Sequence, residues 1–361
     1  ESPTALAKNQ PCSAPIGSGP YVISKVEPQQ GVTLTRNPDY NWAPATAGHS
    51  GPAYLDTLEF RWIPDNAVRS GSAASGQVDV ADTIDPKDVG DLTGQGLNLV
   101  KADAPGAPYQ LYINVSHEPF NDVRVRQAFL YSLDIDGIVN ALYFGQYKRA
   151  WGPIAPSTFG YDPKVEGSWK QDFDKANALL DEAGWVKKGD FREKDGKRLV
   201  ARWPYAGGTR EQRDAVGQLI KEQAKAIGID VDIQAVGVGP YLEAAQSNQY
   251  DIADFSFVRS SPDVLRSLFD STNRVTKEQI RQNWSQLQDD QIDTWVRQAA
   301  QTLDTAKRTD LYAKVQEWVV NNAVVVPVYV PADLVVSASK VHGITMDPQA
   351  YPVYYDVWVD Q

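Results

Sequence analysis

The sequence predicts an α/β protein built from two lobes, and three observations lead to this prediction. The chain has 361 residues, more than one typical hydrophobic core holds, so two domains are expected. Residues 1–113 read as short strands with tight connections, which predicts a β-rich lobe. Residues 199–262 alternate between strand and helix patterns, and this β-α-β-α-β order predicts a parallel sheet with right-handed crossovers.

The composition restricts the classes of function. The chain carries 35 basic and 46 acidic residues, and its formal net charge of -11 argues against a nucleic-acid or anionic-membrane surface. No apolar run approaches the roughly 18 residues that a membrane-spanning helix needs. Ten Trp and seventeen Tyr supply many aromatic planes, most of which we assign to the cores and some to a ligand site. Small or neutral ligands stay compatible with these numbers.

Metal and cofactor chemistry has little support in the sequence. The single cysteine, Cys12, excludes an internal disulfide and a thiolate metal cluster. His49, His117 and His342 lie far apart without ligand spacing, so each is interpreted as a surface or locally hydrogen-bonded histidine. No catalytic constellation, cofactor or metal site is predicted. The chain starts at Glu1 and contains one methionine, so we expect a mature, trimmed or truncated chain.

The first third of the chain is predicted to form strands. Two alternating segments, YVISKVE and GVTLTRN, are joined by turn residues and predict a hairpin. A strand through Leu58, Phe60 and Trp62 follows, and QVDVADT and LNLVKAD add two more. The end of the chain returns to this β-rich character, so it is expected to complete the first lobe.

Residues 109–136 are predicted to lead from one lobe to the other. They read as a strand, YQLYINV, followed by one long helix with Asp122 as its N-cap. Apolar residues recur at helical spacing behind this cap, while Arg124 and Arg126 are placed on the solvent side.

The alternating region has clear helix boundaries. A helix is predicted from Thr209 to Ile227, opened by a capping box between Thr209 and Gln212 and closed by Gly228. Pro240 is expected at the first position of the next helix.

Three further helices are expected around this region. One has an aspartate cap and ends with Gly184 at its C′ position. The other two are centred on Trp295 and Trp318, and Leu303 is assigned to the apolar stripe of the first of them.

The candidate site lies at the ends of the three alternating strands. In open α/β sheets, ligands collect at the carboxyl ends of the strands. These ends combine flexible backbone with helix N-termini, which favours anionic or hydrogen-bond-accepting groups, and arginines there would add bidentate donors. The alternative is that Gly, Ser and Thr at these positions are ordinary turn residues. The candidate ligand residues are Tyr205, Arg210, Ser256, Phe257, Arg259 and Ser260.

Seven segments carry a family resemblance that runs over nearly all of residues 11–361. They are PIGSGPY, LTRNPDYNW, PAYLDTLEFRWIPD, GQVDV, YINVSHEPFNDVRVRQAFLYSLD, KANALLDEAGW and VVVPVY. In this order and spacing they resemble the extracellular solute-binding proteins of the peptide/nickel ABC-transporter class, family 5. The resemblance implies an α/β, periplasmic-binding-protein-like two-lobe clamp of type II, peptide-binding class. It also implies that the amino-terminal part of lobe one is absent from this chain.

The resemblance implies where the lobes and hinges lie. Lobe one is expected to comprise residues 1–113 and 326–361, and lobe two residues 114–325. Hinges are expected near 112–115 and 324–329, with ligand favouring the closed state.

The resemblance also implies ligand contacts. Peptide binders of the family place a tryptophan and an aspartate after the third strand, where this chain has Phe257 and Ser260, with Arg259 adjacent. A serine beside an arginine cannot hold an ammonium group as a carboxylate does, so an anionic, sugar-like or chelate-like solute is favoured over a peptide. The other residues expected to line the cleft are Asp82, Thr83, Tyr109 and Tyr329. For each of these, a hinge or core role is the alternative.

The function implied is that of the solute-binding component of an ABC importer. Such a protein captures an extracytoplasmic small solute or oligopeptide between its lobes and delivers it to the membrane permease. We expect a monomer in the periplasm or at the cell surface, which meets the membrane only through the permease or through a lipid anchor outside this chain. No enzyme activity is expected. A hydrolase or transferase acting in the same cleft is the alternative, and a chaperone-like surface protein is a third possibility.

Overall fold

The chain folds into two compact units in the computed structural model, which describes residues 16–207 and 211–360. Unit 1 comprises Glu1–Ala102 and Asp333–Gln361, and unit 2 is the continuous stretch Asp103–Ala332. Cys12 and Thr209 lie outside the described residues. No helix in the described part is long and apolar enough to cross a membrane.

The boundaries of the units differ from the expected lobe boundaries because of one strand, β6 (Gly106–Ile113). All 8 of its residues are buried, and it pairs antiparallel with β13 (Ile252–Val258) on one side and β14 (Val325–Val330) on the other. Since both partners belong to unit 2, the whole of β6 belongs there too. The expected lobe boundaries, at residue 113 and residue 326, would cut this sheet.

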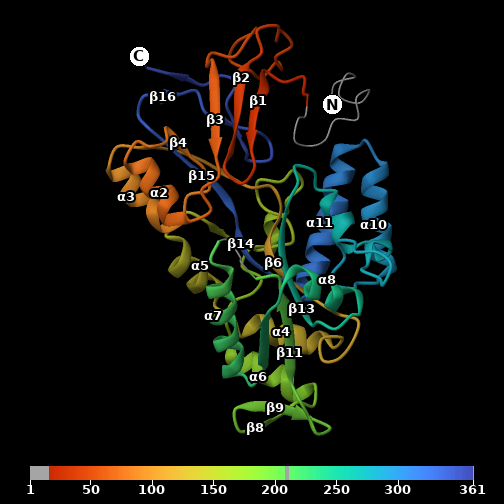
Figure 1. The fold of residues 1–361 in the computed structure, drawn as a ribbon. Coiled ribbons are helices and arrows are strands. Elements are labelled where there is room, and N and C mark those ends of the chain that lie inside the picture. Colours follow the sequence, from red (N-terminus) through yellow and green to blue (C-terminus); the bar gives the residue numbers. More distant parts are fainter. Residues whose placement is uncertain (1–15, 208–210, 361) are drawn as a thin grey trace. The chain divides into compact units, whose positions relative to one another are not determined.

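Unit 1 consists mainly of short strands with two short α-helices (Figure 1). The predicted hairpin is confirmed as β1 (Tyr21–Glu27) and β2 (Gly31–Arg36), and β3 (Thr57–Arg61) extends it to three antiparallel strands. A second sheet has the order β4-β15-β5, so a strand from the end of the chain lies between two earlier strands. The remaining elements of unit 1 are α2 (Asn66–Ala74), β4 (Val80–Ala81), the 3₁₀ turn η1 (Pro86–Asp88), α3 (Val89–Gly94), β5 (Asn98–Asp103), β15 (Ala332–Ser337), β16 (Val341–His342), β17 (Thr345–Met346), β18 (Pro352–Val353) and β19 (Trp358–Val359).

Unit 2 is organised around a four-stranded antiparallel sheet in the order β13-β6-β14-β7, with β7 at Lys148–Arg149. A separate pair, β11 (Val200–Tyr205) and β12 (Asp230–Ala235), is parallel. The predicted β-α-β-α-β sheet is therefore right for its first two strands and wrong for β13. The edge of β13 is taken by the fully buried β6, and one backbone hydrogen bond, from Asp251 N–H to the Arg202 carbonyl (2.9 Å), links β13 to β11.

The helices between these strands start at other residues than predicted. The first, α7, spans Arg213–Ala226, and its N-cap Gln212 makes no side-chain capping bond, so the predicted capping box does not open it. Its end is as predicted, because Gly228 follows with a φ of 87°. The second, α8 (Val238–Gln246), starts two residues before Pro240.

The predicted long helix after β6 is two helices, α4 (Val123–Tyr131) and α5 (Ile135–Tyr143). The Asp122 cap is confirmed, since its carboxylate accepts the Arg124 N–H. A second cap, Asp134, accepts the N–H of Gly137 and starts α5, which explains the break.

Arg126 does not lie on the solvent side of α4 as predicted. It is buried, at 7% exposure, and donates to three backbone carbonyls, those of Phe120 (2.7 Å), Asn121 (3.1 Å) and Asn322 (3.0 Å). These acceptors satisfy the guanidinium, so this charged side chain can be buried. One of them, Asn322, follows α11 (Thr305–Asn321), and the spacing of residues around Arg126 cannot reveal a partner so far along the chain.

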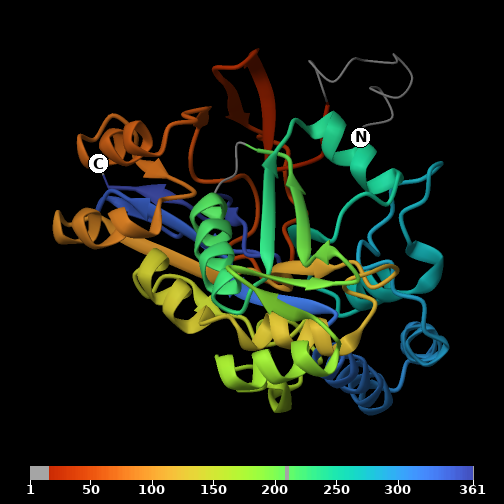
Figure 2. The same cartoon turned by 90° about the horizontal axis from the view of Figure 1, so that it is seen from below.

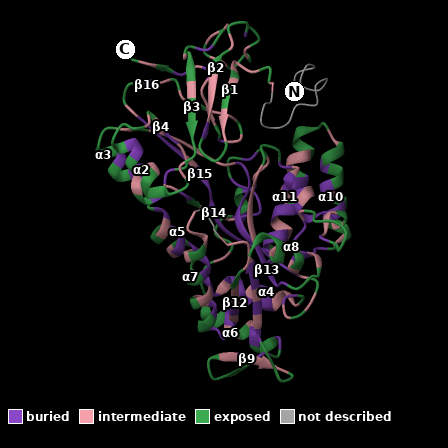
Figure 3. Ribbon diagram, viewed as in Figure 1, coloured by how far each residue is buried: buried purple, intermediate pink, exposed green. Residues whose placement is uncertain are grey.

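The remaining helices and hairpins of unit 2 pack around the sheet. Figures 1 and 2 both show α10 and α11 as neighbouring helices, and Figure 3 shows the buried residues concentrated in the central strands and on the inner faces of helices. The predicted caps Asp172 and Gly184 are confirmed at the two ends of α6. The other elements are η2 (Pro163–Val165), α6 (Phe173–Glu182), β8 (Val186–Lys188), β9 (Phe191–Lys194), β10 (Lys197–Arg198), α9 (Val264–Phe269), η3 (Ser271–Asn273), α10 (Asp290–Gln301) and α11 (Thr305–Asn321).

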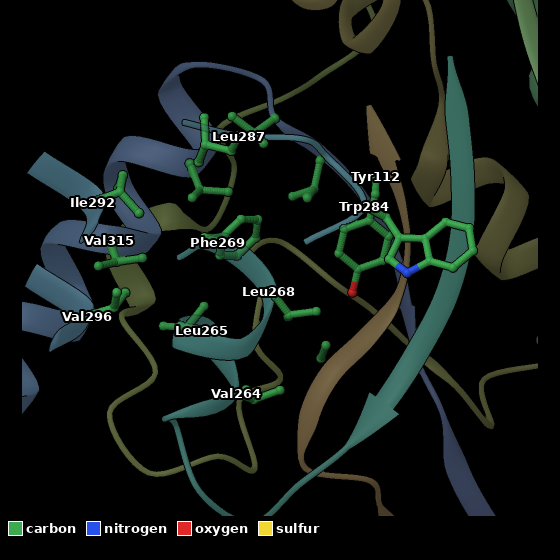
Figure 4. Close-up of a cluster of buried hydrophobic side chains, with 14 of the residues drawn as sticks. Tyr112, Val264, Leu265, Leu268, Phe269, Trp284, Leu287, Ile292, Val296 and Val315 are labelled. Atoms are coloured by element: carbon green, nitrogen blue, oxygen red, sulfur yellow. The ribbon is translucent and has the colours of Figure 1, made fainter. Parts of the chain in front are cut away.

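A large apolar cluster joins α9, α10 and α11 to the sheet. Phe269 is fully buried in it, and Figure 4 shows this side chain among those of Leu265, Leu268 and Ile292. Leu303, which was assigned to the same stripe, is 98% exposed because α10 ends at Gln301.

Candidate functional site

The candidate site of unit 2 lies at one end of its four-stranded sheet. Because β6 runs antiparallel to both of its neighbours, its first residues lie beside the last residues of β13 and β14. Tyr109 of β6 and Tyr329 of β14 are direct cross-strand partners, and their rings stack at 4.8 Å. The pairing register therefore brings together two site residues that are far apart in the sequence.

Both tyrosines are fully buried, and their hydroxyl groups are satisfied by carboxylates. Tyr109 donates to Asp254 Oδ2 (3.0 Å), and Tyr329 donates to Glu211 Oε2 (2.8 Å). Burial raises the pKa of both hydroxyls well above the usual value, so they stay protonated donors. Because both side chains are fully buried and both hydroxyl groups are already hydrogen-bonded, the two tyrosines stabilise the site internally and expose no surface to a ligand.

Arg213, the first residue of α7, links this support together. Its Nη2 donates to Glu211 Oε2 (2.7 Å) and to Ser256 Oγ (3.1 Å), and its guanidinium lies 4.5 Å from the centre of the Tyr109 ring. The side chains of Arg213 and Glu211 are 14% and 13% exposed. We call these five residues, Tyr109, Glu211, Arg213, Ser256 and Tyr329, the Arg213 cluster.

The ionisation states within the cluster follow from its contacts. Burial lowers the pKa of Arg213, but the adjacent oxygens of Tyr329 and Glu211 raise it by more, so the guanidinium stays charged. The neighbouring Asp254 has a pKa raised by burial, although it accepts hydrogen bonds from Trp203 Nε1 (2.9 Å) and Tyr109. The ion pair inside the cluster is thus neutral overall, and Asp254 is held by neutral donors.

The backbone that enters α7 is strained. Glu211 and Gln212 have φ angles of 63° and 53°, consecutive left-handed conformations that side chains other than glycine adopt at a cost of about 1–3 kcal/mol each. The Tyr143 hydroxyl donates to the Glu211 carbonyl (2.7 Å) and holds this turn. Such strain at a strand end is typical of a functional site.

The exposed part of the site lies at the end of β13. Arg259 stacks its guanidinium 4.1 Å from the centre of the half-buried Phe257 ring and donates from Nη1 to the Val258 carbonyl (2.8 Å). Ser260, beside it, is exposed. Arg259 makes no ion pair with any residue in the described ranges. It therefore keeps donors available at the surface of an acid-rich protein.

Gly106 fixes this end of β13 against β6. Its φ is 95°, and a Cβ built there would lie 2.4 Å from the Phe257 carbonyl oxygen and 2.5 Å from the Arg259 nitrogen. Only glycine fits this close approach. The position of Arg259 is therefore set by backbone packing and not by its side chain alone.

The other predicted residue of unit 2 within the described ranges is Tyr205. It is half-buried at the end of β11, and burial, together with a hydrogen bond to Asp214, raises its pKa. Arg210 lies outside the described residues.

The predicted residues of unit 1 form a local group of their own. The N–H of Thr83 donates to Asp82 Oδ1 (2.5 Å), and its carbonyl accepts Arg69 Nη2 (2.6 Å). Thr83 has a φ of 55°, which is a true outlier for a β-branched residue. The pKa of Tyr354 is raised by burial and by the nearby carboxylates of Asp82 and Asp333. A strained, exposed turn next to a carboxylate is consistent with a ligand contact.

Sequence reasoning missed Glu211, Arg213 and Asp254. The aspartate interrupts the apolar strand DIADFSF, and that interruption was the one local signal available. The histidines have local partners, as predicted: His49 lies 2.7 Å from Asp356, His117 2.9 Å from Asp251, and His342 bonds Asp360. Across the described residues, no group of three or more His, Cys, Asp or Glu is placed to hold a metal ion.

Comparisons with known proteins agree on one family. The family model described as "Bacterial extracellular solute-binding proteins, family 5 Middle" matches residues 3–277. The di/tripeptide-binding protein 2 of Pseudomonas aeruginosa is 26% identical over 340 residues, 94% of this chain and 60% of that protein. The heme-binding protein A of Haemophilus influenzae is also 26% identical, over 96% of this chain and 60% of that protein.

A solved structure shows the same fold. NikA from Brucella suis, in complex with Fe(III)-EDTA, superposes with a TM-score of 0.82 at 22% identity, covering 95% of this chain and 68% of that chain. The present chain spans about 60% of the length of the curated relatives it matches.

Proposed function

The chain belongs to the bacterial extracellular solute-binding proteins of family 5, and from this premise we propose that it captures an extracytoplasmic solute for an ABC importer. The observation that carries the proposal is the construction of the β13 end. Arg259 is exposed, has no ion-pair partner among the described residues, and is held over Phe257 and beside Gly106. At the same end of the sheet, the Arg213 cluster is hydrogen-bonded internally and largely buried. This arrangement favours recognition by a pre-organised surface.

The chemistry of the support favours binding over the hydrolase or transferase alternative. The Ser256 hydroxyl accepts a hydrogen bond from the cationic Arg213. A nucleophilic serine needs a neighbouring base that removes its proton, and a guanidinium cannot act as one. The charged groups of the cluster neutralise each other, so they are not available for proton transfer to a substrate.

The clamp implied by the family is part of the proposal. Asp82 and Thr83 would contribute from unit 1, and the expected ligand residues at the end of β13 from unit 2. Two chain segments connect the units, and beside the boundary the Ala104 N–H donates to the Pro331 carbonyl (2.8 Å). The hinges predicted near 112–115 and 324–329 lie within the sheet of unit 2, so we propose that closure is absorbed instead where the chain passes from one unit to the other, at Ala102–Asp103 and Ala332–Asp333.

The proposed partners follow from the family. The solute would be delivered to a membrane permease, with the protein acting as a monomer outside the cytoplasm. Any attachment to the membrane would be through that permease or through a lipid anchor outside this chain.

The solute class is open among the relatives, whose names include di/tripeptide and heme binders. The family's aspartate for a peptide ammonium is replaced here by Ser260. The neighbouring Arg259 adds a positive charge, which would repel an ammonium. We therefore place an anionic or chelate-like solute ahead of a peptide.

Native mass spectrometry of the gently purified protein tests this function, because tightly bound solutes survive the measurement. We expect an additional mass that disappears after partial unfolding and refolding. Scattering on the stripped protein, with the recovered solute added back, should then show compaction. A protein that carries nothing and responds to no added dipeptide, heme or metal chelate would contradict the proposal.

A further inference from the structure

Arg259 is one of several arginines of unit 2 that have no carboxylate partner among the described residues; Arg274 and Arg281, for example, donate to backbone carbonyls instead. Most arginines there meet a carboxylate, as in the pairs of Arg202 with Asp251 (2.8 Å) and Arg297 with Asp270 (2.8 Å). Arg259 has a ring beneath its guanidinium and one backbone carbonyl as acceptor. Although acidic residues outnumber basic ones by 46 to 35, Arg259 has no acidic partner among the described residues, and its remaining N–H donors are available to an external anion.

A second exposed side chain, Phe159, is held beside the same segment. Its ring is 47% exposed, although the residue before it, Thr158, is 3% exposed. Thr158 Oγ1 accepts the N–H of Gly106 (2.7 Å), the glycine that packs against the backbone of Arg259. A Cβ at Gly160 would lie 3.8 Å from that of Pro262, three residues after Arg259. The residue before Phe159 is therefore bonded to Gly106, and the residue after it lies near Pro262 and accepts a hydrogen bond from Gln316 of α11 (2.8 Å).

The partly exposed ring of Phe159 leaves apolar surface in contact with water. A flexible loop could move to bury this ring, but the loop here is held in place. Its loop is pinned further by Ser157 Oγ, which donates to the Ala104 carbonyl (3.1 Å). The segment that carries Phe159 thus lies against the backbone around Arg259, and its ring is partly exposed. Exposed aromatic residues beside fixed polar donors are typical of small-molecule sites.

We propose that Phe159 and Arg259 form one subsite for a solute that carries an anionic group next to a flat apolar portion. This inference rests on the proposed function and names its class of solute. A planar carboxylate would accept two hydrogen bonds from the edge of the guanidinium, whose plane is already set by stacking on Phe257. The apolar portion would cover the ring of Phe159.

Three small probes separate the two contributions. Benzoate has both the charge and the ring, acetate has only the charge, and benzylamine has the ring with the opposite charge. Binding to the stripped protein is followed by ligand-observed NMR at constant ionic strength. Benzoate should bind more tightly than acetate, and benzylamine should not bind at this position.

Substitutions then assign the contributions to residues. Arg259→Ala should weaken benzoate about tenfold or more, the scale of a charge-assisted hydrogen bond. Phe159→Ala should weaken benzoate about 3- to 10-fold and leave acetate unchanged, the scale of an aromatic contact. Phe173→Ala is the matched control, because Phe173 is also partly exposed, at 37%, but starts α6. It should change neither probe.

The outcomes decide between this inference and the proposed function. Equal binding of benzylamine and benzoate, or no effect of Phe159→Ala beyond that of Phe173→Ala, would overturn the subsite. A carried solute whose occupancy is the same in wild type, Arg259→Ala and Phe159→Ala would overturn the subsite while leaving the importer function standing. Benzoate binding that follows both substitutions, in a protein that carries no solute and shows no compaction, would support the subsite and contradict the importer function.

Discussion

Two arginines of unit 2 each lie over an aromatic ring, yet they do opposite things. Arg213 lies 4.5 Å from the centre of the Tyr109 ring, is largely buried, and is paired with Glu211. Arg259 lies 4.1 Å from the centre of the Phe257 ring, is exposed, and has no carboxylate partner among the described residues. In our proposal, the same local geometry serves as internal support at Arg213 and as a surface for solute recognition at Arg259. The two arginines differ in whether a carboxylate pairs with the guanidinium and in how far the side chain is buried.

The largest expected effect is the loss of the carboxylate that makes Arg213 a support. Glu211→Ala leaves a largely buried guanidinium without its partner and removes the acceptor of the Tyr329 hydroxyl. We expect the free energy of unfolding to fall by about 3 kcal/mol. Chemical denaturation measures it. Glu278→Ala, at an exposed position, is the control. If the two variants were equally stable, the pairing of Arg213 with Glu211 would not stabilise the fold, and Arg213 would not differ from Arg259 in this way.

The next effect concerns how Arg259 is placed. Gly106→Ala puts a Cβ into the backbone of Phe257 and Arg259 and adds the strain of a φ of 95°. We expect a stability loss of about 1–3 kcal/mol together with weaker benzoate binding. Thermal unfolding and the NMR titration measure the two effects. Gly71→Ala, in α2 with nothing within 4 Å of the new Cβ, should be neutral or slightly stabilising.

A smaller effect is expected in the pH dependence beside the Arg213 cluster. Burial raises the pKa of Asp254 above its usual value of 3.8, so the folded state binds this proton more readily than the unfolded state. Its contribution to stability therefore grows as the pH falls from above the raised pKa toward 3.8, and it is lost as the pH rises. Asp254→Asn should flatten the stability curve in this window. If denaturation gives the same pH dependence for wild type and Asp254→Asn above pH 3.8, Asp254 does not titrate with a raised pKa.

The smallest effect on stability, and the sharpest contrast, is expected for Arg259→Ala. This side chain is exposed and has no ion pair to lose, so unfolding should change by less than about 0.5 kcal/mol. Affinity for an anionic solute should nevertheless fall by about 1.5–3 kcal/mol. Denaturation and titration on one sample measure both quantities. A destabilised Arg259→Ala with normal affinity would reverse the assignment of the two arginines.

Local signals in the sequence predicted much of the fold. The hairpin of β1 and β2, the caps Asp122 and Asp172, and the glycines after α6 and α7 depend on residues close together in the chain. Those residues set turn and cap geometry directly, so pattern reasoning finds them. The length and composition also predicted two units, but the predicted boundaries between them differ from those of the structure.

What the sequence could not predict depends on contacts between distant segments. The pairing of β13 with β6 and the burial of Arg126 against the Asn322 carbonyl both need partners from other parts of the chain. The Arg213 cluster has the same origin, since Tyr329 and Glu211 meet only after the sheet forms. Arg259 could be singled out because an exposed residue at a strand end needs no distant partner to be recognised.

The position of β6 between β13 and β14 also dictates an order of assembly. β6 is among the first strands of unit 2 to be synthesised, while β14 is the last, so one edge of a strand that is fully buried in the folded protein stays uncovered until nearly the whole unit exists. Such long-range pairing slows folding and leaves an edge open to association with other chains. The region matched by the family model ends at residue 277 and therefore lacks β14, the strand that covers the second edge of β6.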